Sequence, residues 1–443
     1  MISTGIVVLL SLFLLVFWLI SGTPMPIVFG GSCILIVLLI GLNPILIVQV
    51  GYSKMIAVVL LAIPLFVIGG TLMTKTRLGS LIVDWFDCFL GHIKGSMTFV
   101  ATFSFALFSA VSGSGMAILS CLGPLLYKKL TERGYPPNIV AAMLCCAAPL
   151  GLLLPPSVTQ IVYAWAANVS ILACFLAIII PGLMCTILLA VVSMIFVRRS
   201  GAELVVLDKK PLPQWASNAF RQTAKSVPGL AMPIIILGGI YGGIFTVTES
   251  AAVAAVYATI VGVLLYRDIP ISALPRVFSD AGATSGVIMI AIFFIVPYSR
   301  LLLQEGVPQM LIDFLLSVSE NRVIILLMVN LFMMLMGMVL DDICGVLIVA
   351  TVLVPVMRAI GISPYHFAAI VGVNLGFGLI TPPTAPFLFF TSRITGVPVT
   401  KMFKHVMLLI LFVYIPVLIL VTYIPSISLW IPQMVLGDRF SPF

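Results

Sequence analysis

Long apolar stretches recur along the whole chain and are separated by short polar segments. A membrane-spanning helix needs roughly 20 apolar residues, so each uninterrupted stretch of that length predicts one span. A segment at 79–93 mixes charged and apolar residues, which favours a helix lying along the membrane interface. The uninterrupted spans are expected at about 5–21, 26–42, 55–73, 171–197, 229–246, 250–266, 280–303 and 405–424.

Four longer apolar stretches share an interruption by glycine, serine, aspartate or paired proline. Irregular backbone at membrane depth is tolerated only where protein or a polar cavity satisfies it. Two of the stretches, 96–127 and 322–357, are long enough for one tilted span each, but basic residues flank both ends of 96–127 and favour a re-entrant hairpin. The four interruptions lie at Ser112–Gly115, Pro155-Pro156, Gly337–Asp342 and Pro382-Pro383.

Two segments of the chain repeat each other at a separation of 227 residues. Glycine, proline, an Ala-Ala pair and a Gly-x-x-x-Pro-Pro-Ser/Thr run all keep that one offset. Paired, broken hydrophobic segments in the two halves of a membrane protein point to a transporter's binding site. The repeated runs are Gly134-Tyr-Pro-Pro137 with Gly151-Leu-Leu-Leu-Pro-Pro-Ser157, and Gly361-Ile-Ser-Pro364 with Gly378-Leu-Ile-Thr-Pro-Pro-Thr384.

Basic residues are distributed unequally over the two halves. The polar segment 198–228 and the loops of the first half are rich in Lys and Arg, whereas matching loops of the second half are not. Basic loops stay in the cytoplasm, so the two copies are expected to enter the membrane from opposite faces as inverted repeats. We therefore predict a first repeat at 1–228, which ends in a cytoplasmic linker 198–228, and a second repeat at 229–443.

Composition supports an all-α polytopic membrane protein. The chain is 62% hydrophobic and 8% charged, far from the roughly 25% charged residues of soluble domains. The net charge of +8 is explained by orientation signals in loops, so no nucleic-acid partner is expected. The chain carries no G-x-x-x-x-G-K-[ST] motif, which favours a secondary rather than an ATP-driven mechanism.

The interruptions are where binding chemistry is expected. Paired proline leaves carbonyls one turn earlier without donors, and such carbonyls with nearby hydroxyls suit a hard cation. Sodium is the hypothesis for that cation, and no organic cofactor is expected. The pair Asp341-Asp342 follows an apolar run, where a carboxylate usually faces a cavity or a partner. Two roles are open for Arg300 and Arg393: binding an anionic substrate, or extending to the membrane interface.

Several motifs in order along the chain resemble the large membrane subunit of tripartite ATP-independent periplasmic (TRAP) transporters. The resemblance covers nearly the whole chain. It departs at Thr384, which is followed by Ala-Pro, and at Arg393, where the family commonly has a small residue. The matching runs are Ile63-Pro-Leu-Phe-Val-Ile-Gly-Gly70, Ser112-Gly-Ser-Gly-Met-Ala117, Leu154-Pro-Pro-Ser157, Gly238-Gly-Ile-Tyr-Gly-Gly-Ile-Phe-Thr-Val-Thr-Glu249, Gly337-Met-Val-Leu-Asp341 and Asn374-Leu-Gly-Phe-Gly-Leu-Ile-Thr-Pro-Pro383.

The resemblance implies an elevator-type, sodium-driven transporter, in which a mobile domain with two re-entrant hairpins and two broken helices slides past a scaffold. By motif position it places a first sodium site, a second sodium site and a substrate site. The first sodium site would use Ser112, Gly151, Leu154 and Pro156. The second sodium site would use Gly337, Gly378, Thr381 and Thr384. The substrate site would use Ser114, Ser157 and Asp341, and Arg393 is added to it as a specificity element.

The expected function is sodium-coupled import of a small organic anion, a carboxylate or sulfonate, across the bacterial inner membrane. The implied partners are a separate small four-helix membrane subunit, a periplasmic substrate-binding protein and membrane lipid. The alternative is a stand-alone sodium–anion symporter. The sequence disfavours an intramembrane aspartyl protease, because such an enzyme needs two aspartates on separate helices, whereas Asp341 and Asp342 are adjacent. It also disfavours a passive channel, which would need a continuous polar pore.

Overall fold

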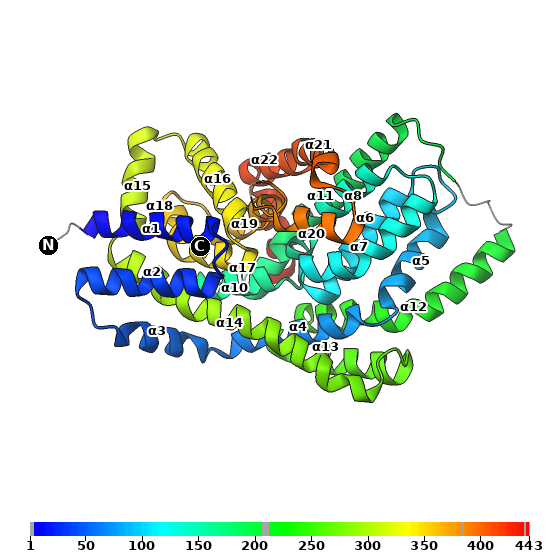
Figure 1. Ribbon diagram of the computed structural model, residues 1–443, viewed down its shortest axis with the longest axis horizontal. Helices are drawn as coiled ribbons and strands as arrows, with labels where there is room; N and C mark the ends of the chain where they lie inside the picture. The colour runs from blue at the N-terminus through cyan, green and yellow to red at the C-terminus, as the bar shows by residue number, and fades with distance from the viewer. Residues whose placement is uncertain (1–3, 206–211, 383, 438–439, 443) are drawn as a thin grey trace.

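In the computed structural model the chain is described over residues 4–205, 212–382, 384–437 and 440–442, and every element in these ranges is helical (Figure 1). Seven helices of the described ranges are long and apolar enough to span a membrane, or nine if each of two bent pairs counts as one span. Apolar side chains also cover the outside, for example Leu38 at 68% exposure. The protein is a polytopic helical membrane protein, as predicted.

One group of helices packs around the long helix α14 (Leu274–Gln304). Helices α2 (Met25–Ile40) and α3 (Ile45–Met55) pack along its C-terminal half, and α1 (Thr4–Ile20) packs on α2 (Figure 1). Glycine permits the close approach of α3, since a Cβ on Gly51 would lie 2.9 Å from the carbonyl oxygen of Phe293. The same group continues through η1 (Val58–Leu61), α4 (Ala62–Thr74), α5 (Leu78–Leu90), α12 (Leu212–Tyr241), α13 (Val247–Ile260), η2 (Val261–Leu265) and η3 (Ile271–Ala273).

The predicted span 55–73 is only part of a bent pair. Helix α3 precedes it, and the axis turns by 71° between Ile45–Met55 and Val58–Thr74. The sequence pattern hid α3 because Gln49, Ser53 and Lys54 dilute its apolar residues. Lys54 therefore lies at the bend between two apolar helices.

A second group surrounds the predicted interruptions. The first hairpin is formed by α6 (Met97–Ser112) and α7 (Gly115–Glu132), which pack against each other. The chain then enters a helix that stops and restarts with a bend of 42°. This broken helix consists of α8 (Pro137–Ala147), α9 (Leu150–Leu153) and α10 (Val158–Ala166), and the long α11 (Ile171–Arg199) follows it.

The second half repeats this order. Helix α16 (Arg322–Val339) stops before Leu340, and α17 (Asp342–Ile348) starts after Asp341, so the predicted break is confirmed. Helix α19 (Pro364–Gly378) ends before the second paired proline and α20 (Pro386–Thr395) follows it; Pro383 itself lies outside the described residues. The remaining helices are α15 (Val307–Val318), η4 (Val349–Leu353), α18 (Val354–Ala359), α21 (Val399–Leu409), η5 (Ile410–Tyr414), α22 (Ile415–Tyr423) and α23 (Ser426–Leu436).

The linker predicted at 198–228 is much shorter in the structure. Helix α11 runs to Arg199, and α12 begins at Leu212, so most of the predicted linker is helical. An aromatic face explains the difference: the indole N–H of Trp215 donates to the Cys88 carbonyl at 3.1 Å, and its ring meets Phe89 edge to face. These contacts hold α12 on α5, while residues 206–211, which include Lys209 and Lys210, lie outside the described residues.

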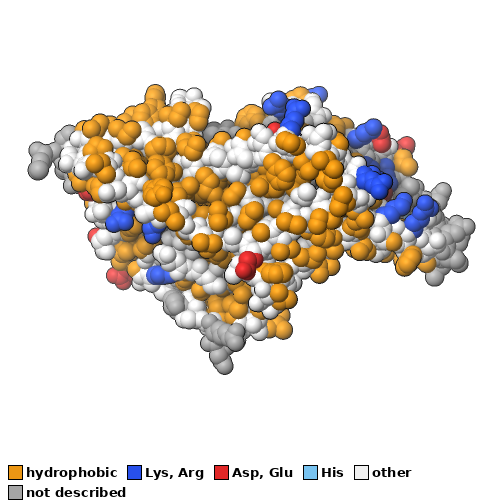
Figure 2. Space-filling view, turned by 90° about the horizontal axis from the view of Figure 1, so that it is seen from below, with side chains coloured by type: hydrophobic (Ala, Val, Ile, Leu, Met, Phe, Trp, Pro, Cys, Tyr) orange, Lys and Arg blue, Asp and Glu red, His pale blue; other side chains and the backbone are white. Residues whose placement is uncertain are grey.

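Charged side chains join α5 to the end of α7. Arg133 contacts both carboxylate oxygens of Asp87, at 2.8 and 2.6 Å, and the Lys129 ammonium lies 2.9 Å from the same carboxylate. Burial would raise the pKa of Asp87, but the hydrogen bonds and charges of Arg133 and Lys129 outweigh it and hold the pKa below its ordinary value. In Figure 2 several Lys and Arg side chains gather at this end of the molecule, and others lie toward the opposite end.

Two side chains cap the start of α13. The Thr246 backbone N–H donates to the Glu249 carboxylate at 2.7 Å, and the Glu249 N–H donates to the Thr246 hydroxyl at 3.2 Å. This reciprocal capping box gives Glu249 a capping role.

Candidate functional site

The first broken helix meets the tip of the first hairpin. Gly113 has φ +60° and reverses the chain between α6 and α7. A Cβ on Gly113 would lie 2.8 Å from the Pro156 carbonyl oxygen, and one on Gly151 would lie 2.5 Å from the Gly115 nitrogen. Side chains would not fit at either place, so glycine is what allows hairpin tip and break to touch backbone to backbone.

Ser109 ties the same hairpin to the end of the broken helix. Its hydroxyl donates to the carbonyls of Leu150, at 2.9 Å, and Leu154, at 3.3 Å. The Leu150 carbonyl also accepts from the Leu154 N–H at 3.1 Å, so Ser109 adds a contact from the hairpin to a turn that is already formed. The four residues predicted for the first cation site thus lie together: Ser112, Gly151, Leu154 and Pro156.

The second half builds a similar junction. A Cβ on Gly378 would lie 2.7 Å from the Cα of Gly337, so α19 and the end of α16 also touch through backbone. The Thr384 hydroxyl donates to the carbonyl of Met338. The Thr381 hydroxyl donates to the Phe377 carbonyl at 2.8 Å and keeps lone pairs for a further contact. Gly337, Gly378, Thr381 and Thr384 are therefore also grouped at one junction.

The two junctions are joined crosswise. Helix α10, which follows the first break, packs on α17 of the second hairpin, and the Thr159 hydroxyl donates to the Asp342 carboxylate at 3.0 Å. Helix α20, which follows the second break, packs on α7 of the first hairpin. There the Phe387 ring would lie 2.7 Å from a Cβ on Gly115. Each broken helix thus continues onto the other repeat's hairpin.

Three helices begin at the residues predicted to contact substrate. Ser114 precedes α7, Ser157 precedes α10 and Asp341 precedes α17, each in extended backbone. Ser157 is fully buried and accepts from the Gln160 N–H at 3.5 Å, and Asp341 accepts from the Cys344 N–H at 2.8 Å. The Val158 N–H donates to the Gly113 carbonyl at 3.4 Å, and the Thr159 hydroxyl contacts the Asp342 carboxylate, so the start of α10 lies beside the other two. Helix N-termini carry partial positive charge, so neighbouring helix starts favour an anionic group.

Arg393 lies apart from these residues. It occupies the last turn of α20 and is exposed. It lies seven residues after Pro386, where α20 begins, which corresponds to roughly 10 Å along the helix. The structure does not bring it to the helix starts, and its role as a specificity element stays a prediction.

Sequence reasoning missed Thr159 and Ser109 in this region. It directed attention to Asp341, whereas the structure gives the contact between repeats to Asp342 and Thr159. The two lie 183 residues apart, so no local pattern links them. Ser109 was missed as well, although its place one turn before Ser112 on the hairpin was a usable signal.

Comparison with known proteins shows the family. The family model "Tripartite ATP-independent periplasmic transporter, DctM component" matches residues 9–427. The C4-dicarboxylate TRAP transporter large permease protein DctM of Pseudomonas aeruginosa is 35% identical over 77% of this chain and 78% of that protein. The sialic acid TRAP transporter large permease protein SiaM of Vibrio cholerae is 32% identical over 85% of this chain and 87% of that protein.

A longer relative and a solved structure extend the comparison. The isethionate TRAP transporter permease protein DctMQ of Oleidesulfovibrio alaskensis is 29% identical over 89% of this chain and 61% of its own length. The crystal structure of the YdaH transporter of Alcanivorax borkumensis aligns with a TM-score of 0.62 at 17% identity. That alignment covers 87% of this chain and 89% of that one, and it shows a likeness of fold alone.

The structure is that of a helical membrane protein with two broken helices, and one family model matches most of its length. These observations together identify the family. The chain belongs to the DctM family, is the large permease component of a tripartite ATP-independent periplasmic transporter, and is a multi-pass membrane transporter subunit rather than an enzyme.

Proposed function

We propose that this subunit couples inward sodium movement to the import of a small organic anion, a carboxylate or a sulfonate. The observation that carries the proposal is that the start of α10 at Ser157 lies beside the helix starts at Ser114 and Asp341. The relatives are named for C4-dicarboxylates, sialic acid and isethionate, which are all organic acids.

Sodium is proposed because both junctions offer carbonyl and hydroxyl oxygens. Ser112, Leu154 and Pro156 supply them in the first, and Thr381 and Thr384 in the second. Such oxygen-only surroundings suit hard cations. The membrane potential supports the coupling, because each charge that crosses 100 mV gains about 2.3 kcal/mol.

We also propose that the two halves are inverted repeats and that the hairpin domain moves as an elevator past the helices around α14. Support comes from the repeated order of hairpin and broken helix and from the basic end formed by α5, α7 and the end of α11. With that end in the cytoplasm of a bacterial inner membrane, α6 and α7 insert from the cytoplasmic side and α16 and α17 from the other side.

The partners we propose are a periplasmic substrate-binding protein and a small four-helix membrane subunit. The family description names a periplasmic system of three parts. This chain spans 61% of the longer isethionate relative, so the rest of that protein has room for a small subunit. Here that subunit would be a separate chain.

Reconstitution in proteoliposomes tests the proposal. The chain, a small subunit and a binding protein are supplied with a sodium gradient and, in turn, with succinate, N-acetylneuraminate and isethionate. Uptake of one anion that depends on sodium and on the binding protein is expected. Full uptake by this chain alone would instead establish the stand-alone symporter.

Thr381→Ala is expected to raise the sodium concentration for half-maximal uptake, because it removes an oxygen from the second junction. Thr395→Ala is the matched control, since the Thr395 hydroxyl also donates to a carbonyl four residues earlier, at 2.7 Å, but lies away from the junction. Equal sodium dependence of the two variants would exclude Thr381 as a ligand.

Asp341→Asn tests the substrate site. Asparagine caps helices about as well as aspartate, so α17 is expected to keep its start and the protein to insert normally. Loss of uptake in a folded variant is expected because the carboxylate charge is gone. Uptake at the unaltered rate would remove the Asp341 charge from the mechanism.

A further inference from the structure

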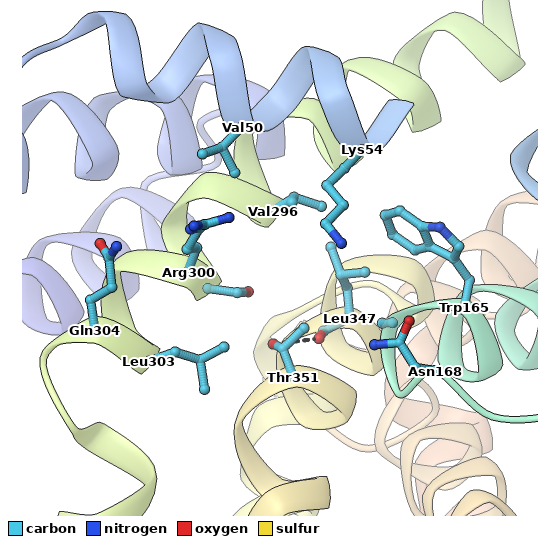
Figure 3. Close-up of a pocket in the computed structure, with 12 residues that line it drawn as sticks. Val50, Lys54, Trp165, Asn168, Val296, Arg300, Leu303, Gln304, Leu347 and Thr351 are labelled. Carbon is cyan, nitrogen blue, oxygen red and sulfur yellow. Dashed lines mark hydrogen bonds between the residues drawn. The ribbon is translucent and has the colours of Figure 1, made fainter. Parts of the chain in front are cut away.

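A cavity of about 430 Å³ lies between the two groups of helices, away from the junctions. Helices α3 and α14 form one wall, and α10 and α17 with η4 form the other (Figure 3). Lys54 and Arg300 both extend from the first wall toward this space. None of the described residues that line the cavity is acidic, so the lining carries two positive charges.

Neither cation is neutralised within the described part of the chain. No ion pair or side-chain hydrogen bond involves Lys54 or Arg300 among those residues. Lys54 lies beside the 71° bend that follows α3. Gly51, one turn earlier, packs against Phe293, which stands eleven residues before the end of α14 and so about 16 Å inside it. Lys54 and Arg300 are both exposed to this open space, and a cation beside a membrane span usually faces a polar cavity or a partner.

The cavity also offers neutral groups suited to an acidic ligand. Asn168 and Thr351 face the cavity, and Gln304 closes one side (Figure 3). Trp165, Leu347 and Val296 supply apolar surface. Two cations, amide donors and an apolar floor together form a site for a carboxylate or sulfonate that carries a carbon skeleton.

The same two helices lead from this cavity to the proposed substrate site. Helix α10 starts at Ser157 and reaches the cavity at Trp165, while α17 starts after Asp341 and reaches it at Leu347. These intervals correspond to roughly 9 to 12 Å of helix. The cavity lies near the start of α11, whose other end carries Arg198 and Arg199. With that basic end in the cytoplasm, the cavity is on the periplasmic side.

We propose that this cavity is a second anion-binding site, in which Lys54 and Arg300 hold the acidic group of the substrate on its way to the helix starts. The proposal rests on the proposed import of an organic anion. It assigns Arg300 to a substrate path instead of the lipid interface.

Cysteine labelling tests the cavity without relying on transport. Gln304→Cys places a thiol at its edge, and the unsubstituted protein gives the background, since its described cysteines are buried or half-buried. Labelling rates are compared for sulfonatoethyl and trimethylammonioethyl methanethiosulfonate, which carry opposite charges. Relative to their rates with a free thiol in solution, the anionic reagent is expected to be favoured over the cationic one. This charge preference is expected to fall on the order of threefold for each of Lys54→Gln and Arg300→Gln.

Arg276→Gln is the matched control, because it removes a cation from the other end of α14. An unchanged preference in Lys54→Gln and Arg300→Gln, or an equal loss in Arg276→Gln, would overturn the proposal. Succinate, N-acetylneuraminate and isethionate are then tested for protection of the thiol in zwitterionic liposomes. Protection by at least one is expected. Protection that appears only when anionic lipid is added would mean a lipid headgroup site and would also overturn it.

Uptake separates this proposal from the import function. In the reconstituted system, Lys54→Gln with Arg300→Gln is expected to raise the substrate concentration for half-maximal uptake several-fold, with sodium dependence unchanged. Arg300→Lys is expected to restore most of the loss, because it keeps the charge. If no anion is taken up by any preparation, the proposed function fails, whereas the labelling result still decides whether the cavity binds anions.

Discussion

Gly378→Ala is the sharpest test of the second junction. The added Cβ would lie 2.7 Å from the Cα and 2.8 Å from the carbonyl carbon of Gly337, whereas ordinary contact begins at 3.4 Å. The two backbones must therefore separate by about 0.7 Å, which exceeds the tolerance of roughly 0.2 Å for metal–ligand distances. Overpacking of this kind costs about 1–3 kcal/mol, and 1.4 kcal/mol is a tenfold change in an equilibrium constant.

The sodium concentration for half-maximal uptake is measured in proteoliposomes, with melting temperature in sodium and in choline as a second readout. We expect the half-saturating sodium concentration to rise about tenfold and the stabilisation by sodium to shrink. Helix propensity acts in the opposite direction, since alanine favours a helix by up to 1 kcal/mol over glycine.

Gly286→Ala provides the control, because a Cβ there meets nothing within 4 Å in the same kind of helical backbone. It is expected to match the unsubstituted protein in both readouts. Gly151→Ala makes the equivalent change at the first junction, where the Cβ would lie 2.5 Å from the Gly115 nitrogen. A Gly378→Ala protein with half-saturation within twofold of the original would refute a cation site at this junction.

Three further predictions concern contacts elsewhere in the molecule. The pKa of Asp87 is held below its ordinary 3.8, so the ionised carboxylate stabilises the folded protein above pH 3.8, and this stabilisation is lost as the pH falls further. Arg133→Gln should make the loss smaller in melting curves recorded at acid pH. A melting curve that is unchanged by Arg133→Gln would contradict this prediction. Thr246→Ala should lower the free energy of unfolding by about 1 kcal/mol and Thr246→Ser by much less, as measured by denaturant titration; equal losses would argue against capping. Thr159→Val and Asp342→Asn should be non-additive in a double-mutant cycle of uptake, whereas independent effects would deny their contact.

The positions of the breaks were predictable because proline and glycine act locally. Pro155-Pro156 ends α9, and Gly113 turns the first hairpin, through properties of those residues themselves. The grouping of Ser112 with Gly151 and of Gly337 with Gly378 came from the family resemblance, by motif position, and the structure brings the residues of each group together.

The crosswise contacts were not predictable from one sequence. Thr159 and Asp342 belong to different repeats, and an isolated threonine after a proline break looks like an ordinary helix start. The extra helix α3 and the early start of α12 were missed for a related reason: polar residues such as Lys54 lower the apolar signal of a helix whose partners are distant in sequence. Arg393 was selected by departure from a motif, which carries no information on distance.

The crosswise packing also affects how the protein is made. The hydrogen-bond partner of Thr159, Asp342, is synthesised 183 residues later, and the partner of the Gln160 amide, the Ala368 carbonyl, is synthesised 208 residues later. At 5–20 residues per second, a ribosome needs roughly 10 to 40 s to supply these partners. During that interval the polar start of α10 depends on the insertion machinery or on water for its hydrogen bonds. Truncation between the halves should therefore leave a first half that is inserted yet recognised by membrane quality-control proteases.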